Sequence, residues 1–327
     1  MDETEPTTKR PPRKRDAVIN VLRGFCMGAA DTVPGVSGGT VALILGHYQR
    51  LVTAISNVDA SALTLLRQRR WRALAKHIDL HFLLCLLAGI VLGIGSLSGL
   101  MHYLLEHHYP ETMAVFTGFL VASAWIVRAE VQRWSASRWV TLFAGIALAV
   151  SIILMPRSQN ELSGPYLFLC ASISICAMIL PGISGAFVLL LMGVYHEVIT
   201  IIKETARGNW TAENLIYLVI FAAGCGFGLL SFSKLLRWLL HRHRDVTMAG
   251  LVGLMIGSIY KLYPLQRPTP ETAERKFKER ELEMIWPNDW EGGVVHLVVL
   301  VVASAIAVWW IENRFAEPQP DATTLDA

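Results

Sequence analysis

The sequence predicts an all-α polytopic membrane protein made of two inverted-topology repeats. Of the 327 residues, 53% are hydrophobic and only 17% are charged, and the mean hydropathy is +0.44. A soluble domain seldom has this composition. The apolar segments approach the ~20 residues needed to cross a bilayer. A Pro-Gly-x-Ser-Gly break also interrupts apolar sequence twice. The net charge of +3 says little, since the placement of Lys and Arg sets membrane topology.

The two breaks lie in segments 31–40 (DTVPGVSGGT) and 178–187 (MILPGISGAF). Proline cannot donate a backbone hydrogen bond and glycine lets the chain turn, so each pair should end one half-helix. Inside a bilayer such breaks are tolerated only where they are buried in protein or line a cavity. Paired breaks are typical of transporters. The predicted helix breaks are Pro34, Gly35, Pro181 and Gly182.

The breaks belong to a longer internal repeat. Alignment of Pro34 with Pro181 also aligns Gly35/Gly182, Ser37/Ser184, Gly38/Gly185, Gly46/Gly193 and Tyr48/Tyr195. A second block downstream aligns Gly89/Gly224, Gly93/Gly228, His108/His243, Gly118/Gly253 and Ser123/Ser258. Glycines, prolines and serines rarely coincide over two long blocks by chance, so we infer an internal duplication.

Each repeat is predicted to contain one hairpin and three membrane helices. A disordered, basic, cytoplasmic N-terminus (1–16) precedes them and a cytoplasmic tail (313–327) follows. Counted from its proline, each hairpin arm has about 15 to 20 residues, which hardly span ~30 Å at 1.5 Å per residue. Both hairpins are therefore predicted to be re-entrant. Repeat 1 (17–156) comprises hairpin 17–55 and helices 80–104, 112–129 and 139–156; repeat 2 (165–312) comprises hairpin 165–203 and helices 214–240, 246–262 and 293–312.

Crossing parity and charge placement predict the orientation. A hairpin contributes an even number of membrane crossings, so with its three helices each repeat crosses an odd number of times. The second repeat is therefore inverted relative to the first. Placing both termini in the cytoplasm puts the basic regions inside, as the positive-inside rule requires. The mixed-charge loop 261–291 then lies outside, where its length and its glutamates weaken the rule. The cytoplasmic basic residues are those of 9–15, Arg67, Arg69, Arg70, Arg72, Lys76, Arg128, Arg133, Arg138, Arg237, Arg242 and Arg244.

The N-terminal region also resembles a cleaved signal peptide. A basic cluster at 9–15 precedes an apolar segment, 18–30, that ends in small residues. However, the break beside the would-be cleavage region recurs deep in the chain, and a discarded peptide has no reason to be duplicated. We therefore favour a retained hairpin.

The residues after each proline predict an anion site. Serine is a natural N-cap, and a helix N-terminus attracts anions through its unpaired N–H groups and partial positive charge. Two inverted hairpins would bring two such ends together near the midplane. The alternative is that small residues only permit close helix packing. The candidate phosphate-binding residues are Ser37, Gly38, Gly39, Thr40, Ser184 and Gly185, with Arg50 as a charge partner.

Asp31 precedes the first break and aligns with Met178. A lone carboxylate inside a membrane is costly and marks a functional candidate. It could carry a coupling proton, help to bind a cation, or cap a local turn.

Charged and histidine side chains follow each hairpin. Arg50 and Glu197 occupy aligned positions and could form a gating pair between the repeats. His47 and His196 are further candidates for coupling or gating. The alternative is that these residues mark where each hairpin reaches the lipid headgroups.

The sequence offers no sign of catalysis. It contains no zinc motif, P-loop or nucleophile elbow, and its five cysteines show no C-x-x-C spacing. We therefore predict no enzyme activity, no metal and no cofactor. A membrane-embedded lipid phosphatase or transferase would need a convergent acid, base and nucleophile, which the chain does not supply.

The paired motifs resemble those of the bacterial polyprenyl-phosphate transporters. The resemblance rests on segments 28–40, 45–48, 180–185 and 192–195 and extends over about 17–312. It implies a flippase that returns undecaprenyl phosphate from the outer to the inner leaflet of the cytoplasmic membrane, recycling the lipid carrier of peptidoglycan synthesis. We expect alternating access, with proton coupling through Asp31 as a hypothesis, and membrane lipids but no nucleic acid as partners. The alternative is a transporter of a small soluble anion or of a sodium-coupled solute.

Overall fold

The computed structural model describes residues 14–33, 36–156, 162–270, 282–290 and 293–315. These residues form an α-helical molecule with one small antiparallel sheet, in which β1 (Gln266–Pro268) pairs with β2 (Leu282–Met284). The predictions for 1–13, 316–327, Pro34 and Gly35 lie outside the described residues. Residues 14–16, predicted to be disordered, instead begin a helix, and 313–315, predicted to belong to the tail, end one.

Among the described residues, five helices are long and apolar enough to cross a membrane. Much of their apolar surface is exposed, as expected for side chains that face lipid. α14 (Val294–Phe315) adds a shorter apolar stretch, Val294–Trp310. The prediction of an all-α polytopic membrane protein is therefore confirmed. The five spans are α6 (Leu80–His107), α7 (Tyr109–Arg128), α8 (Ala136–Leu154), α12 (Ala212–Arg242), and α13 (Arg244–Ser258) continued by η1 (Ile259–Leu262).

The hairpin regions each contain three helices rather than the two arms that the sequence predicts. The return arm is itself broken at a glycine with positive φ, Gly46 (71°) or Gly193 (75°). Each short return helix has seven residues, so it rises only about 10 Å. The first region contains α1 (Lys14–Asp31), α2 (Gly38–Ile44) and α3 (Tyr48–Ser56); the second contains α9 (Gly164–Ile179), α10 (Gly185–Leu191) and α11 (Tyr195–Ala206).

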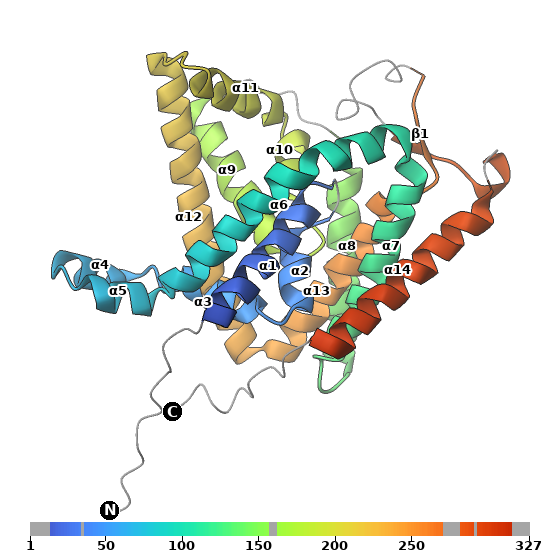
Figure 1. The fold of residues 1–327 in the computed structure, drawn as a ribbon, viewed down its shortest axis with the longest axis horizontal. Helices are drawn as coiled ribbons and strands as arrows, with labels where there is room; N and C mark the ends of the chain where they lie inside the picture. Colours follow the sequence, from blue (N-terminus) through green and yellow to red (C-terminus); the bar gives the residue numbers. More distant parts are fainter. Residues whose placement is uncertain (1–13, 34–35, 157–161, 271–281, 291–292, 316–327) are drawn as a thin grey trace, which may run out of the picture.

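The third helix of each region turns away from the second. α10 and α11 are bent by 114°. In Figure 1, α11 lies at the top of the molecule and α3 lies low in it, so the two regions reach opposite ends. The long α12 runs between these ends beside α9.

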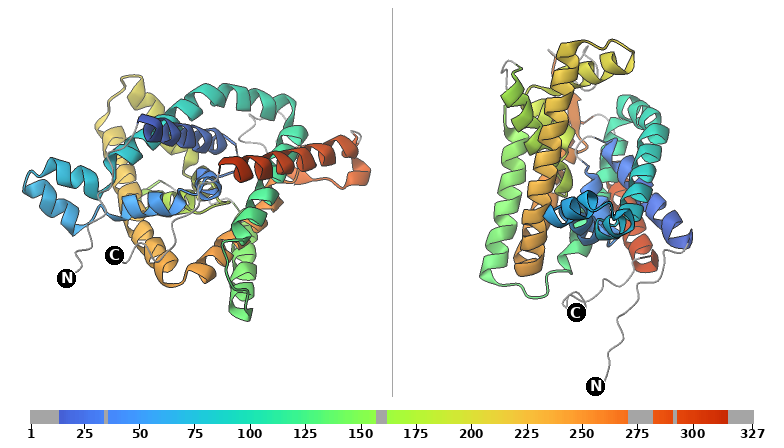
Figure 2. Two further views of the ribbon diagram at one scale, coloured as in Figure 1. Left: turned by 60° about the horizontal axis from the view of Figure 1, so that its bottom comes forward. Right: turned by 90° about the vertical axis from the view of Figure 1, so that its left-hand side faces the viewer.

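A short helical pair projects from the body between α3 and α6. α4 (Ala60–Arg67) and α5 (Trp71–His77) extend to one side in Figures 1 and 2. Asp59 begins α4 by accepting a 3.0 Å hydrogen bond from the Ala62 N–H. This bond holds the pKa of Asp59 below its usual range. Segment 60–77 carries basic residues and no acidic one.

Glycines bring the half-helices directly against long helices. A Cβ at Gly24 of α1 would collide with the backbone of Leu86 in α6, and a Cβ at Gly89 of α6 would collide with the carbonyl of Val21. Gly224 of α12 lies in the same way against the backbone of α9. Glycine permits such close backbone approach. α1 therefore packs on α6, and α9 packs on α12.

Aligned positions of the two halves share backbone geometry. His108 joins α6 to α7 and His243 joins α12 to α13, and both have φ −135° and ψ 46°. Gly46 and Gly193 share a positive φ in the same way. The aligned residues thus occupy equivalent turns.

Candidate functional site

Ser37 connects the two breaks. Its hydroxyl lies 3.2 Å from the carbonyl oxygens of both Met178 and Leu180, at the end of α9. The single hydroxyl hydrogen is shared between these acceptors. The Ser37 oxygen also accepts a 3.1 Å bond from the Gly39 N–H, so Ser37 caps α2 as the sequence predicts.

Thr40 and Tyr48 extend the same contact. The Thr40 hydroxyl accepts a 3.0 Å hydrogen bond from the Gly182 N–H, and the Tyr48 hydroxyl donates a 3.1 Å bond to the Ile179 carbonyl. Thr40 and Tyr48 are both buried. Backbone groups released at the second break therefore find partners on side chains of the first, which an apolar environment requires.

The Asp31 carboxylate lies at the beginning of α2. Its Oδ1 accepts a 2.6 Å hydrogen bond from the Gly38 N–H, across the segment that contains the first break. The Thr40 N–H donates to the Ser37 carbonyl at 2.9 Å. The N–H groups of Gly38, Gly39 and Thr40 thus already have acceptors within the chain. A phosphate could bind Gly38 only after Asp31 moves away.

The second break is built differently. Ser184 occupies the N-cap position of α10, as predicted, but among the described residues its side chain makes no cap hydrogen bond. The Ser174 hydroxyl of α9 instead donates a 2.7 Å bond to the Gly185 carbonyl. Pro181 and Gly185 are buried, and Gly182 has a φ of 85°. α10 is thus held to α9 by a side chain outside the repeated motif.

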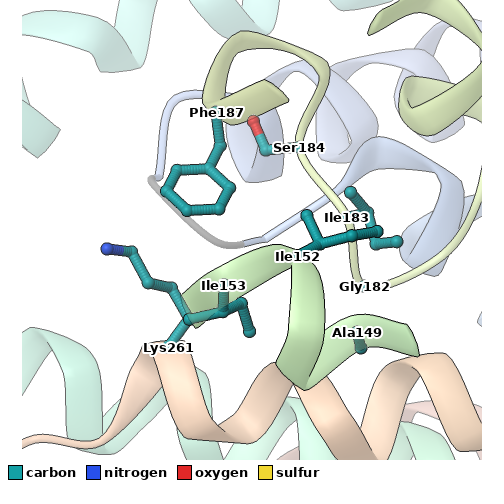
Figure 3. A pocket seen from close by; sticks show the side chains of 8 residues that line it. All are labelled: Ala149, Ile152, Ile153, Gly182, Ile183, Ser184, Phe187 and Lys261. Carbon is teal, nitrogen blue, oxygen red and sulfur yellow. The ribbon is translucent and has the colours of Figure 1, made fainter. Parts of the chain in front are cut away.

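A small pocket adjoins this second break (Figure 3). Ser184, Phe187 and the backbone of the break form one wall, and the end of α8 forms another. Lys261, at the end of the α13 span, completes it, with Nζ 4.8 Å from the centre of the Phe187 ring. The full lining is Ala149, Ile152, Ile153, Gly182, Ile183, Ser184, Phe187 and Lys261.

Arg50 and Glu197 do not form the predicted gating pair. The Arg50 Nε contacts Asp79 Oδ2 at 2.7 Å, and the guanidinium carbon lies 4.2 Å from the centre of the Phe82 ring. Glu197 is exposed on α11. α3 and α11 reach opposite ends of the molecule, which explains the separation (Figure 1).

The two candidate histidines occupy contrasting environments. His47 is 2% exposed, and its Nε2 lies 3.3 Å from the Met27 sulfur. Its Nδ1 has no hydrogen-bond partner among the described residues. His196 is exposed on α11 beside the ring of Tyr195. The structure therefore buries His47 against α1 and leaves His196 exposed.

A protein-family model described as undecaprenyl phosphate translocase-like matches residues 27–279, a range that contains both breaks. The chain belongs to this family.

Two curated relatives agree with the family match. The chain is 40% identical over 243 residues to a polyprenyl-phosphate transporter of Vibrio cholerae, covering 74% of this chain and 76% of the relative. It is 34% identical over 259 residues to a polyprenyl-phosphate transporter of Staphylococcus aureus, covering 75% and 86%. No solved structure shows significant similarity. The family and relatives are named as transporters, which confirms the prediction of a transporter rather than an enzyme.

Sequence reasoning missed Lys261 as a candidate site residue of this transporter. It assigned Lys261 to the outer loop 261–291, whereas the structure places it beside Ser184 and Phe187. The available signal was weak: Lys261 is the first charged residue after Asp245, at the end of a long uncharged run. Only the fold shows that this run ends against the second break.

Proposed function

We propose that this protein transports a polyprenyl phosphate, with undecaprenyl phosphate as the expected form, from the outer to the inner leaflet of the bacterial cytoplasmic membrane. The hydrogen-bonded contact between the two broken helical regions carries this proposal, since transporter sites commonly lie at such interfaces. The names of the two relatives support the choice of substrate.

The two halves act in this proposal as inverted repeats. The matched dihedral angles at His108 and His243, and the matched positive φ at Gly46 and Gly193, support the duplication. Alternating access then follows from movement of one repeat against the other about the contact between the breaks. Both termini lie in the cytoplasm in this scheme, and α11 faces the outside.

The phosphate headgroup binds between the breaks while the prenyl chain stays in lipid. The proposed ligands are N–H and hydroxyl groups of Ser37, Gly38, Gly39, Thr40, Ser184 and Gly185. Those of the first break bond within the chain in the present conformation, so binding requires the breaks to separate. We leave Arg50 out of this set because it is paired with Asp79 and largely exposed.

Asp31 couples binding to protons in this scheme. Its carboxylate holds the Gly38 N–H that a phosphate would need. Two anions cannot share this position without strong repulsion, and protonation of Asp31 removes one of the charges. Proton uptake by Asp31 therefore accompanies entry of the phosphate.

A leaflet-exposure assay tests the function. Purified protein is reconstituted in liposomes with undecaprenyl phosphate, and the fraction accessible to an impermeant headgroup probe is followed with time. We expect equilibration between leaflets only with active protein. In cells lacking this protein and its functional substitutes, the lipid should accumulate in the outer leaflet. Uptake of inorganic phosphate without any change in lipid exposure would instead support the soluble-anion alternative.

A further inference from the structure

We propose that the pocket between α8, η1 and the second break is an initial binding site for a phosphate monoester headgroup, with Lys261 as its cation and Ser184 as its hydroxyl partner. This inference rests on the proposed function and adds an earlier headgroup position, which adjoins the site between the breaks and shares Ser184 with it.

The fold brings a cation and a hydroxyl to one small cavity. Lys261 and Ser184 are far apart in the sequence, yet both line the pocket and both are partly exposed. Phe187 lies beneath the ammonium, with its ring centre 4.8 Å from Nζ. This contact holds the ammonium at one edge of the pocket, with the Phe187 ring between it and Ser184 (Figure 3).

The chemistry of the lining suits a phosphate. An ammonium donates up to three charge-assisted hydrogen bonds, and the Ser184 hydroxyl adds another donor. The remaining lining is mostly apolar, including Ile152 and Ile153 of α8. Apolar walls lower the local dielectric constant and strengthen the attraction between an ammonium and a phosphate.

The surroundings suit a lipid rather than a free ion. Leu154 and Met155, which directly follow the pocket residue Ile153, are 61% and 62% exposed. Exposed apolar residues at the end of a spanning helix face lipid. A headgroup at Lys261 can therefore leave its prenyl chain along α8, in the membrane.

The position suits the beginning of transport. Lys261 precedes β1, and β1 lies at the same end of the molecule as α11 (Figure 1). In the proposed orientation this end faces outside, so the pocket meets lipid of the outer leaflet. From there the Gly182 and Ser184 wall leads directly to the second break.

Binding measurements on the full-length protein in nanodiscs test the site. The probes are a short-chain polyprenyl phosphate, the corresponding polyprenol and inorganic phosphate. We expect Lys261→Gln to weaken binding of the polyprenyl phosphate at least about 10-fold, as for loss of a hydrogen bond to a charged group, and Lys261→Arg to stay within about 3-fold. Lys203→Gln, at an exposed lysine of α11, is the matched control and should bind normally.

The three probes distinguish binding of a lipid headgroup from binding of a free phosphate ion. Binding of the lipid phosphate, but not of the polyprenol, supports the headgroup assignment. Equal loss of inorganic phosphate and lipid phosphate binding in Lys261→Gln would show a general phosphate site. Unchanged lipid phosphate binding in Lys261→Gln would overturn the proposal and leave Lys261 as an interfacial anchor on Phe187.

A second measurement needs no substitution. Acylation of lysines by an amine reagent is followed by mass spectrometry in the wild-type protein. Polyprenyl phosphate should slow acylation of Lys261 several-fold and leave Lys203 unchanged, and the polyprenol should protect neither. Absence of protection at saturating lipid would also overturn the proposal. If the wild-type protein fails to move the lipid between leaflets, the proposed function fails; normal wild-type transport with unimpaired Lys261→Gln binding rejects only this site.

Discussion

In the contact between the two breaks, the first region contributes side-chain groups, whereas the second contributes backbone groups. Ser37, Thr40 and Tyr48 all bond to main-chain atoms of segment 178–182. At positions aligned with Asp31 and Thr40, the second half has the apolar residues Met178 and Phe187. The two aligned segments are thus unequal, and the second depends on the first to satisfy the backbone groups of its broken helix.

The largest expected difference concerns the small residues after each serine. A Cβ at Gly39 would lie 2.6 Å from the Ile179 carbonyl, whereas the aligned Ala186 already carries a Cβ and is exposed. We expect Gly39→Val to destabilise the protein by about 3 kcal/mol and Ala186→Val by less than about 0.5 kcal/mol. Thermal unfolding in detergent measures both, and equal losses would contradict the asymmetry.

The second largest difference in stability is expected between the two aligned serines, Ser37 and Ser184. Ser37→Ala removes a cap and a donor to two carbonyls, so we expect a loss of about 2 kcal/mol. Ser184→Ala removes no cap bond and should cost less than about 0.5 kcal/mol. Chemical denaturation in the same detergent compares the pair. A larger loss for Ser184→Ala would mean that the second break does not depend on the first.

Asp31 should affect transport more than stability. Asp31→Asn keeps an oxygen near the Gly38 N–H but removes the charge and the titration, so we expect at most about 1 kcal/mol of destabilisation. Lipid transport in liposomes should lose its dependence on an imposed pH gradient. Met178→Leu, at the aligned position, should leave that dependence intact. Unaltered dependence in Asp31→Asn would leave Asp31 as a cap alone.

The smallest effect is expected at the aligned charged residues. The Arg50–Asp79 pair is largely exposed, so Arg50→Gln should cost about 0.2 to 1 kcal/mol, decreasing with salt. Glu197→Gln should change stability by less than about 0.3 kcal/mol. Unfolding at low and high salt measures both. If the stability losses of Arg50→Gln and Glu197→Gln were strongly non-additive in the double mutant, that result would support the predicted gating pair.

Local chemistry and hydropathy predicted much of the fold. The breaks follow from Pro-Gly in apolar sequence, and the long helices follow from uncharged runs such as the one after Asp245. The turn at Gly46 was missed because a single glycine inside an apolar segment also fits a continuous helix.

Contacts between residues far apart in the chain could not be predicted from the sequence. The sequence allowed the hypothesis that Asp31 caps a local turn. It did not identify the partner, which is the Gly38 N–H seven residues later. The partner of Arg50 is Asp79, from a different segment, and Lys261 comes to line one pocket with Ser184 only through the packing of α13 against α8. None of these pairings has a periodic or compositional signature.

The glycine contacts of α1 with α6 and of α9 with α12 also limit how many parts can move independently. Where one backbone rests on another, no layer of flexible side chains remains to absorb sliding. Each half-helix is therefore mechanically one body with its long partner. The movement that a conformational cycle needs is then left to α2 and α10, two seven-residue helices that are each followed by a glycine turn.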